Sequence, residues 1–184
     1  RVNFALDAIR GLKACWRLVC LDEDGLDDFD LSADGFWNSF AALILVAPLY
    51  LYSSSAGARL ASPPQPERPW FSAFALLALL WVLWPWIMIT VSRLLDRQQH
   101  YVRYIVAYNW SSVYVIAALV PVFILQQVGI IGVGIGALLS LCVIIWSLYY
   151  RWYVARIALD VPAVTSSMLV AGDLAMSIVA SAVV

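Results

Sequence analysis

The first residues to examine for chemistry are the polar and ionisable side chains that interrupt long apolar runs. Asp173 is the only acidic residue well inside such a run. A bare carboxylate in hydrocarbon costs roughly 2.5–3.5 kcal/mol even on insertion scales, so we expect Asp173 to be protonated, hydrated or paired. Its expected hydrogen-bond donors are Asn109, Ser111 and Ser112, which lie together in another run. We expect no Lys or Arg of this chain at the depth of Asp173, so its ionised form would need water, a metal or a partner's cation.

The side chains that intramembrane hydrolases use do not form a set in this sequence. Such enzymes need a nucleophile with a base, or paired aspartates. Asp173 has no second carboxylate in the apolar runs, and His100, the single histidine, lies at an expected membrane edge. The cysteines form no CxxC pair, which argues against redox and zinc sites; they are Cys15, Cys20 and Cys142. We therefore predict no enzymatic activity, no cofactor and no metal site.

Composition places these residues in a membrane protein. Of 184 residues, 64% are hydrophobic and 12% are charged, whereas an ordinary soluble domain is about 25% charged. The mean hydropathy is +0.85, which excludes a soluble globule. The formal net charge is −1, so no basic surface for nucleic acid is expected.

Five apolar runs come close to the ~20 residues that a helix needs to cross the hydrocarbon of a bilayer. We predict an all-α polytopic membrane bundle of five transmembrane helices, preceded by an amphipathic interfacial helix. The transmembrane domain covers residues 36–184, and its predicted spans are 36–52, 70–95, 102–125, 128–150 and 161–184.

Residues 1–21 show the periodicity of an amphipathic helix. One face carries Leu6, Ile9, Leu12 and Trp16, and the other carries Arg10, Lys13 and Arg17. This pattern predicts a helix in the headgroup plane of an anionic leaflet, with the cations facing headgroups or solvent. The alternative is a helix that packs on the end of the bundle.

Residues 22–35 form an acidic loop. It holds seven acids, but Leu31 stands where an EF-hand needs its bidentate Glu. A solvated loop is the expectation, with weak binding of a divalent cation or a basic partner as alternatives. Asp30 or Ser32 is expected to cap the helix that begins near Gly35.

Two rows of small residues predict close helix–helix contacts. They are Gly132, Gly136 and Ser140 in the fourth span, and Ser167, Ala171 and Ala175 in the fifth. Pro48 and Pro85 predict kinks in the first and second spans. Pro85 lies within a cluster of tryptophans, Trp81, Trp84 and Trp86, which predicts ring packing or contact with lipid or a partner.

The arginines predict the orientation. With the N-terminus inside, nine of the eleven Lys and Arg residues fall on the cytoplasmic side, and only Arg59 and Arg68 fall outside. We predict a cytoplasmic N-terminus and an external C-terminus. The Arg-rich, Lys-poor composition favours a bacterial inner membrane.

The five-helix plan resembles the Yip family of membrane proteins and its bacterial relatives. The segment Tyr101–Trp110, YVRYIVAYNW, is similar to the entry of that family's third helix, and the run from Trp146 through Val184 is similar to its passage into a fifth helix. The resemblance implies a membrane-embedded adaptor or assembly factor without catalysis.

Two functions follow from these features. The first is a non-catalytic accessory or scaffold subunit, or an assembly factor, that contacts the lipid bilayer and other membrane subunits or itself through the small-residue rows. The alternative is a small transporter, channel or lipid-handling protein. Its polar path would include Asp173, Asn109, Gln126 and Gln127.

Reversing the charge of Arg10, Lys13 and Arg17 to Glu is expected to weaken the binding of a peptide of residues 1–21 to anionic vesicles. Each cation near such a surface contributes about 1 kcal/mol. Cosedimentation of the wild-type and reversed peptides at low and moderate salt checks this. Equal binding of both peptides at both salt concentrations would contradict the electrostatic part of the prediction.

Overall fold

The structure is a computed structural model that describes residues 4–61 and 63–183. These residues are 83% helical and contain no strand. Arg1 to Asn3 and Val184, which belong to the predicted segments 1–21 and 161–184, lie outside the described residues. Five helical stretches are long and apolar enough to cross a membrane, which agrees with the predicted all-α plan: Ala33–Leu60, Trp70–Leu94, Gln98–Gln127, Val133–Leu159 and Ala163–Ser181.

Two of these stretches are interrupted between two α-helices. The first contains α2 (Ala33–Ser39) and α3 (Ala42–Leu60), and α3 runs through Pro48. The third contains α5 (Tyr101–Ala117) and α6 (Val120–Gln127). Pro121 explains the second interruption, because it has no N–H to donate to the carbonyl of Ala117 and is tolerated only in the first turn of a helix.

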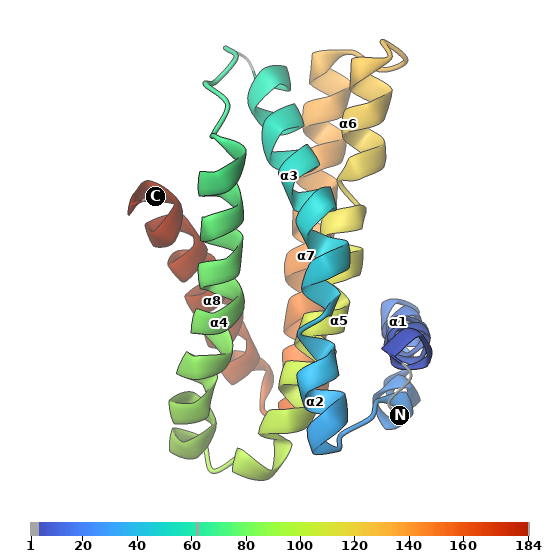
Figure 1. The fold of residues 1–184 in the computed structure, drawn as a ribbon, viewed down its shortest axis with the longest axis vertical. Coiled ribbons are helices and arrows are strands. Elements are labelled where there is room, and N and C mark those ends of the chain that lie inside the picture. The colour runs from blue at the N-terminus through green and yellow to red at the C-terminus, as the bar shows by residue number, and fades with distance from the viewer. Residues whose placement is uncertain (1–3, 62, 184) are drawn as a thin grey trace.

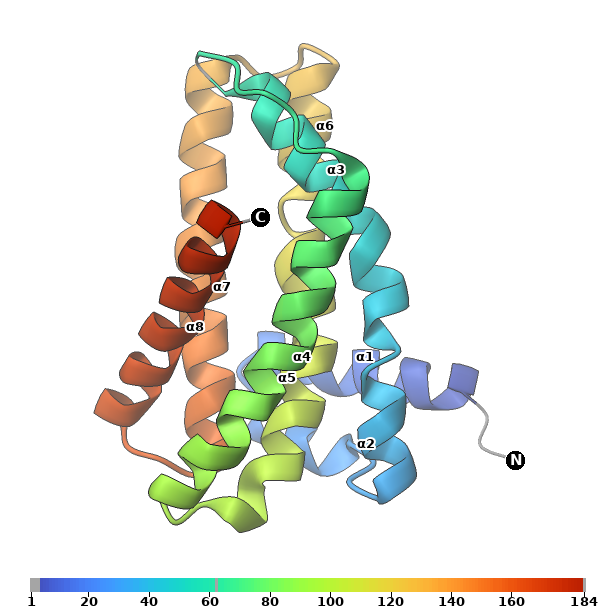
Figure 2. The same ribbon diagram turned by 60° about the vertical axis from the view of Figure 1, so that its left-hand side comes forward.

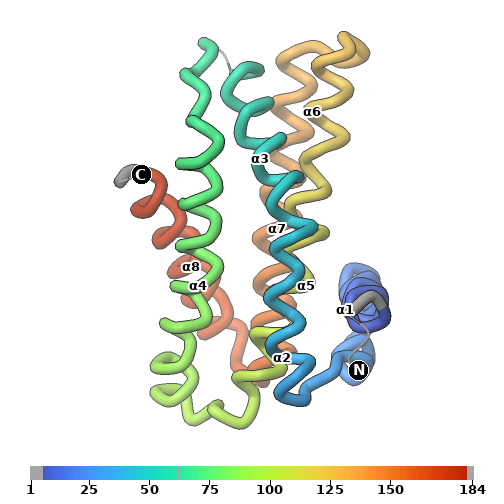
Figure 3. Tube along the Cα trace, viewed as in Figure 1, coloured from blue at the N-terminus to red at the C-terminus, as the bar shows by residue number. Residues whose placement is uncertain are grey.

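The remaining long helices are α4 (Trp70–Leu94), α7 (Val133–Leu159) and α8 (Ala163–Val183). A short 3₁₀ helix, η2 (Gln98–His100), joins α4 to α5. α5 packs against α3 and α7, and α8 packs against α7 and α4. Figures 1 and 3 show α3, α4, α5 and α7 running along the long axis of the molecule, while α8 leans away toward the C-terminus.

Helix α1 (Phe4–Val19) lies across the bundle: Figure 1 shows it nearly end-on and Figure 2 from the side. Its bundle-facing surface is built from the buried residues Gly11, Ala14, Cys15 and Leu18. Gly11 permits this approach, because a Cβ there would lie 2.6 Å from the Trp110 ring. α1 thus packs on the side of the bundle against α5, whereas the alternative expected it on the end of the bundle, and its position relative to a membrane stays a prediction.

Three of the four residues of the predicted apolar face of α1 lie on the exposed side of the helix. Leu6 and Ile9 are 59% and 63% exposed, and Trp16 is also exposed, whereas Leu12 is half-buried against the core. The surface of α1 that meets the rest of the protein consists mainly of small residues, which allow the backbones to approach, together with Leu18. Arg10 and Lys13 are exposed, as expected.

Arg17 is partly exposed, and the acidic segment binds it. Its guanidinium lies 2.7 Å from both Asp22 and Asp28, which are the N-cap and the last residue of the 3₁₀ helix η1 (Glu23–Asp28). These hydrogen bonds raise the pKa of Arg17. Residues 22–28 of the acidic loop are thus ordered and bound to the C-terminal end of α1.

Ser32 caps α2, and its Oγ accepts a hydrogen bond from Gly35 N at 3.1 Å. Asp30 accepts from Ser32 N at 2.9 Å, which lowers the pKa of the Asp30 carboxyl.

Across the described residues, no group of three or more His, Cys, Asp or Glu side chains is placed to hold a metal ion.

The two predicted rows of small residues have different surroundings. Gly136 is buried against Gln126 of α6, whereas a Cβ at Gly132 would meet no atom within 4 Å. Ser140 lines a hollow with Gly57 and Phe123. The row on α8 lies on an exposed face, and the bundle contacts come from other residues of that helix. The exposed residues are Ser167, Ala171 and Ala175, and the buried ones are Ser166, Leu169 and Asp173.

Replacing Gly136 with Leu is expected to destabilise the protein by about 1–3 kcal/mol, the usual cost of forcing extra atoms into packed space. Even a Cβ at this position would lie 2.0 Å from the Gln126 side chain. Gly134→Leu is the matched control, since a Cβ there meets no atom within 4 Å. Thermal unfolding of both variants in detergent checks the prediction, which is wrong if the two midpoints fall equally.

Candidate functional site

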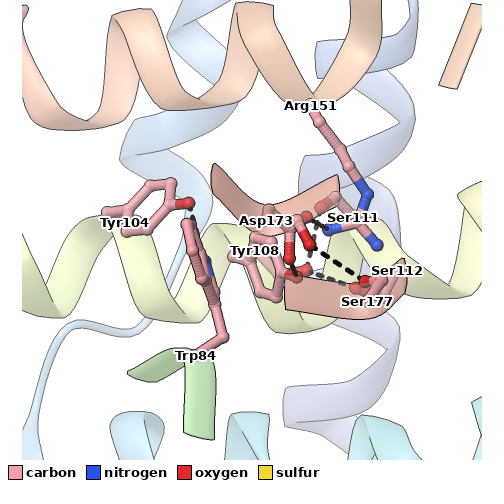
Figure 4. Close-up of polar contacts among 8 residues, drawn as sticks. All are labelled: Trp84, Tyr104, Tyr108, Ser111, Ser112, Arg151, Asp173 and Ser177. Atoms are coloured by element: carbon pink, nitrogen blue, oxygen red, sulfur yellow. Dashed lines mark hydrogen bonds and ion pairs between the residues drawn. The ribbon is translucent and has the colours of Figure 1, made fainter. Parts of the chain in front are cut away.

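An ion pair joins α7 to α8 inside the bundle. Arg151 Nη1 lies 3.1 Å from Asp173 Oδ2, with side chains only 19% and 12% exposed. Tyr108 of α5 donates a hydrogen bond from its hydroxyl to Asp173 Oδ1 at 3.0 Å. Figure 4 shows the three side chains converging, with Ser177 Oγ donating to the Asp173 carbonyl. Both carboxylate oxygens are therefore engaged within the chain.

The presence of Arg151 at this depth corrects the expectation that no Lys or Arg lies near Asp173. The predicted fourth span ends at Tyr150, but α7 continues to Leu159. It does so because its last turns are buried in the bundle, through Tyr153, Val154, Ala155, Ala158 and Leu159. Arg151 therefore lies about two turns inside the helix instead of in a flanking loop.

The sequence contains a signal that could have identified this pair. Arg151 and Asp173 are each eleven residues from Pro162, which lies in the turn between α7 and α8. In an antiparallel helical hairpin, residues equally distant from the turn lie at the same height, because both helices rise 1.5 Å per residue.

Tyr108 contacts both partners of the ion pair. The Arg151 guanidinium carbon lies 4.6 Å from the centre of the Tyr108 ring, within the range of a cation–π interaction. The hydroxyl of the same residue binds Asp173. Tyr108 therefore links the pair to α5 and holds the guanidinium over an aromatic face.

The residues predicted to donate to Asp173 have other partners. Ser111 and Ser112 both donate to the Tyr108 carbonyl at 2.9 Å. Asn109 donates to Ser39 Oγ of α2, also at 2.9 Å, in a buried contact. The predicted hydrogen bonds from these three residues to Asp173 are therefore wrong. Tyr108, on the same helix, points toward α8 and donates to Asp173 instead.

A cavity of about 210 Å³ lies beside the ion pair. Its charged and polar lining includes Arg151, Asp173, Tyr108, Ser112, Ser177 and Ser181. The apolar lining includes Val46 from α3, Ile116 from α5, and Leu76, Leu77, Leu80 and Trp81 from α4. The cavity thus combines a charged pair with a largely apolar lining, which suits an amphipathic molecule.

Two tryptophans of α4 border this region. Trp84 donates from Nε1 to the Tyr104 hydroxyl at 3.0 Å, which ties α4 to α5 (Figure 4). Trp81 lines the cavity, and its buried Nε1 has no hydrogen-bond partner among the described residues. Trp86, the third member of the cluster, is exposed.

The remaining members of the predicted polar path do not reach Asp173. Gln126 packs against Gly136, and Gln127 accepts a hydrogen bond from the Tyr52 hydroxyl at 3.2 Å. Cys15 is fully buried in α1, and this burial raises the pKa of its thiol. The site that the structure assembles is therefore Tyr108, Arg151, Asp173 and the adjoining cavity.

Comparisons with family models, curated proteins and solved structures find no match to this chain.

Removing one charge of the pair is expected to cost roughly 3–5 kcal/mol, because the other charge stays buried without a partner. Asp173→Leu and Arg151→Met should each cause this loss, whereas the double variant should recover most of it. Unfolding in mixed detergent–SDS micelles measures the double-mutant cycle. Additive losses in the double variant would show that the two side chains do not interact.

Proposed function

We propose that this chain is an integral membrane protein that binds an amphipathic ligand in the cavity beside Arg151 and Asp173. Of the functions that the sequence suggests, this one corresponds to the lipid-handling protein. The observation that carries it is a cavity lined by a charged pair and by several leucines within a bundle of five apolar helices. Ionisable residues at such depth are functional candidates by default, because their placement is costly.

The lining supports a division of the ligand into two parts. An apolar chain would contact Leu76, Leu77 and Leu80, where its burial is favourable. A polar group would meet the hydroxyls of Ser177 and Ser181 and the unused N–H donors of the arginine. A volume of about 210 Å³ is below the 300–1,000 Å³ typical of drug-sized pockets, so the cavity would enclose only part of a lipid.

We propose binding without catalysis on the basis of the local hydrogen bonds. The hydroxyls of Ser111 and Ser112 donate to a carbonyl and have no base beside them in the described contacts. The Asp173 carboxylate is held by Arg151 and Tyr108. A carboxylate so engaged is a poor general base.

A bacterial inner membrane with a cytoplasmic N-terminus remains part of the proposal. Support for the orientation comes from the position of the arginines. Arg93, Arg97, Arg103 and Arg156 belong to the segments where α4 and α7 end and α5 begins, at the lower end of the molecule in Figures 1 and 2, whereas Arg59 and Arg68 belong to the opposite end. This distribution follows the positive-inside rule.

The second candidate is the accessory or scaffold subunit suggested by the sequence. The exposed face of α8 favours it, because Ala171, Gly172 and Ala175 form a smooth surface. A Cβ at Gly172 would meet no atom within 4 Å among the described residues. Small residues of this kind allow another helix to approach closely.

Filling the cavity is the direct test of ligand binding. Leu80→Trp places a larger side chain in the cavity, and Leu79→Trp is the matched control because Leu79 is 47% exposed on the same helix. We expect native mass spectrometry to find a bound amphipath on the wild type and on Leu79→Trp, with occupancy at least tenfold lower on Leu80→Trp.

Equal occupancy in all three proteins would contradict the cavity as the binding site. A stoichiometric protein partner recovered with wild type and with both variants, in the absence of a bound amphipath, would favour the scaffold function instead.

A further inference from the structure

An open basin of about 780 Å³ lies at the α1 end of the bundle, separate from the intramembrane cavity. Three segments surround it: η1, the turn from α4 to α5, and the turn from α7 to α8. Figure 2 shows these segments together at the lower end of the molecule. The basin therefore lies where the long helices end, which is the level of lipid headgroups if these helices cross a membrane.

One part of the basin lining is cationic. It contains Arg97, Arg103 and Arg156, with His100 and the exposed acidic residue Asp160 beside them. Arg97 Nε donates to the Asp160 carbonyl at 2.9 Å, and Arg103 Nε donates to the Ala158 carbonyl at 2.8 Å. These bonds hold the guanidinium groups in place and leave further N–H donors free, because each guanidinium has five. Fixed guanidinium groups suit a phosphate, which they can bind in bidentate fashion.

Another part of the lining is anionic. Glu23, Asp24 and Asp27 of η1 border the same basin, and all three are exposed. Within the described residues, none of them forms an ion pair with the arginines of the basin at 4.0 Å or less. Charges of both signs thus line one hollow without neutralising each other by direct contact.

We propose that this basin binds a zwitterion that carries a phosphate and an ammonium group, such as the phosphoethanolamine headgroup of a lipid. The phosphate would meet Arg97, Arg103 and Arg156, and the ammonium group would meet the carboxylates of η1. A bare anion fits less well, since the acidic residues would repel it. A bare cation is disfavoured in the same way by the arginines.

The lipid form of this zwitterion fits the position of the basin at the helix ends, whereas the soluble form would share only its charge pattern. Short-chain lipids separate these sources. Wild-type protein in a non-ionic detergent is titrated by calorimetry with dihexanoyl phosphatidylethanolamine, dihexanoyl phosphatidylglycerol, free phosphoethanolamine and inorganic phosphate. We expect the phosphatidylethanolamine to bind most tightly, by about tenfold over the phosphatidylglycerol, which lacks the ammonium group.

Two variants test the two signs of charge. Arg156→Gln and Asp27→Asn should each weaken binding of the phosphatidylethanolamine about tenfold, because each removes one charge-assisted contact. Only Asp27→Asn should strengthen binding of the phosphatidylglycerol, since it lowers the repulsion of an anion. Arg93→Gln and Asp96→Asn are the matched controls, because both residues are exposed and lie outside the basin.

Several outcomes would overturn the proposal. These are tighter binding of phosphatidylglycerol or inorganic phosphate to wild type, equal losses in the basin and control variants, or no loss in either basin variant at an unchanged thermal midpoint. Tightest binding of free phosphoethanolamine would support the zwitterion and assign it a soluble source. Leu80→Trp should leave these affinities unchanged, so this proposal and the intramembrane cavity can fail separately.

Discussion

The ion pair between Arg151 and Asp173 is the interaction on which the arrangement of the C-terminal half depends. Two charges are held in helices whose other residues are mostly apolar, and each is tolerable there only because the other is present. A slip of α8 along α7 by one turn would move the charges apart by about 5.4 Å. The pair therefore fixes the register of this hairpin, and through Tyr108 it fixes the hairpin against α5.

The number and order of the long helices could be predicted from the sequence, because bilayer thickness sets the length of an apolar run. The helix ends could not be predicted in the same way. A hydropathy boundary falls at the first charge, as at Arg151, whereas the backbone hydrogen bonds of α7 continue to Leu159. Because the predicted span ended at Tyr150, Arg151 was not expected beside Asp173. The equal distance of Arg151 and Asp173 from Pro162 in the sequence nevertheless indicated this pair.

The faces of the helices were the other feature that sequence periodicity could not assign. Lipid is as apolar as a protein core, so an apolar stripe does not reveal which side meets the bundle. In α1 the contact is made by Gly11, Ala14 and Cys15, while Leu6 and Ile9 face outward. The size of the residues decides this outcome, because Trp110 occupies the space above Gly11.

Helix α7 connects the two hollows of the molecule. Its last carbonyls lack partners within the helix. Arg103 binds those of Ala158 and Ile157, and Arg97 binds the carbonyl of Asp160, the C-cap residue. About two turns earlier the same helix is bound to α8 through Arg151. α7 is thus held at two heights by charged groups, once beside the open basin and once beside the cavity at Asp173. Because one rigid helix supplies both positions, the geometry of each hollow depends on the same placement of α7.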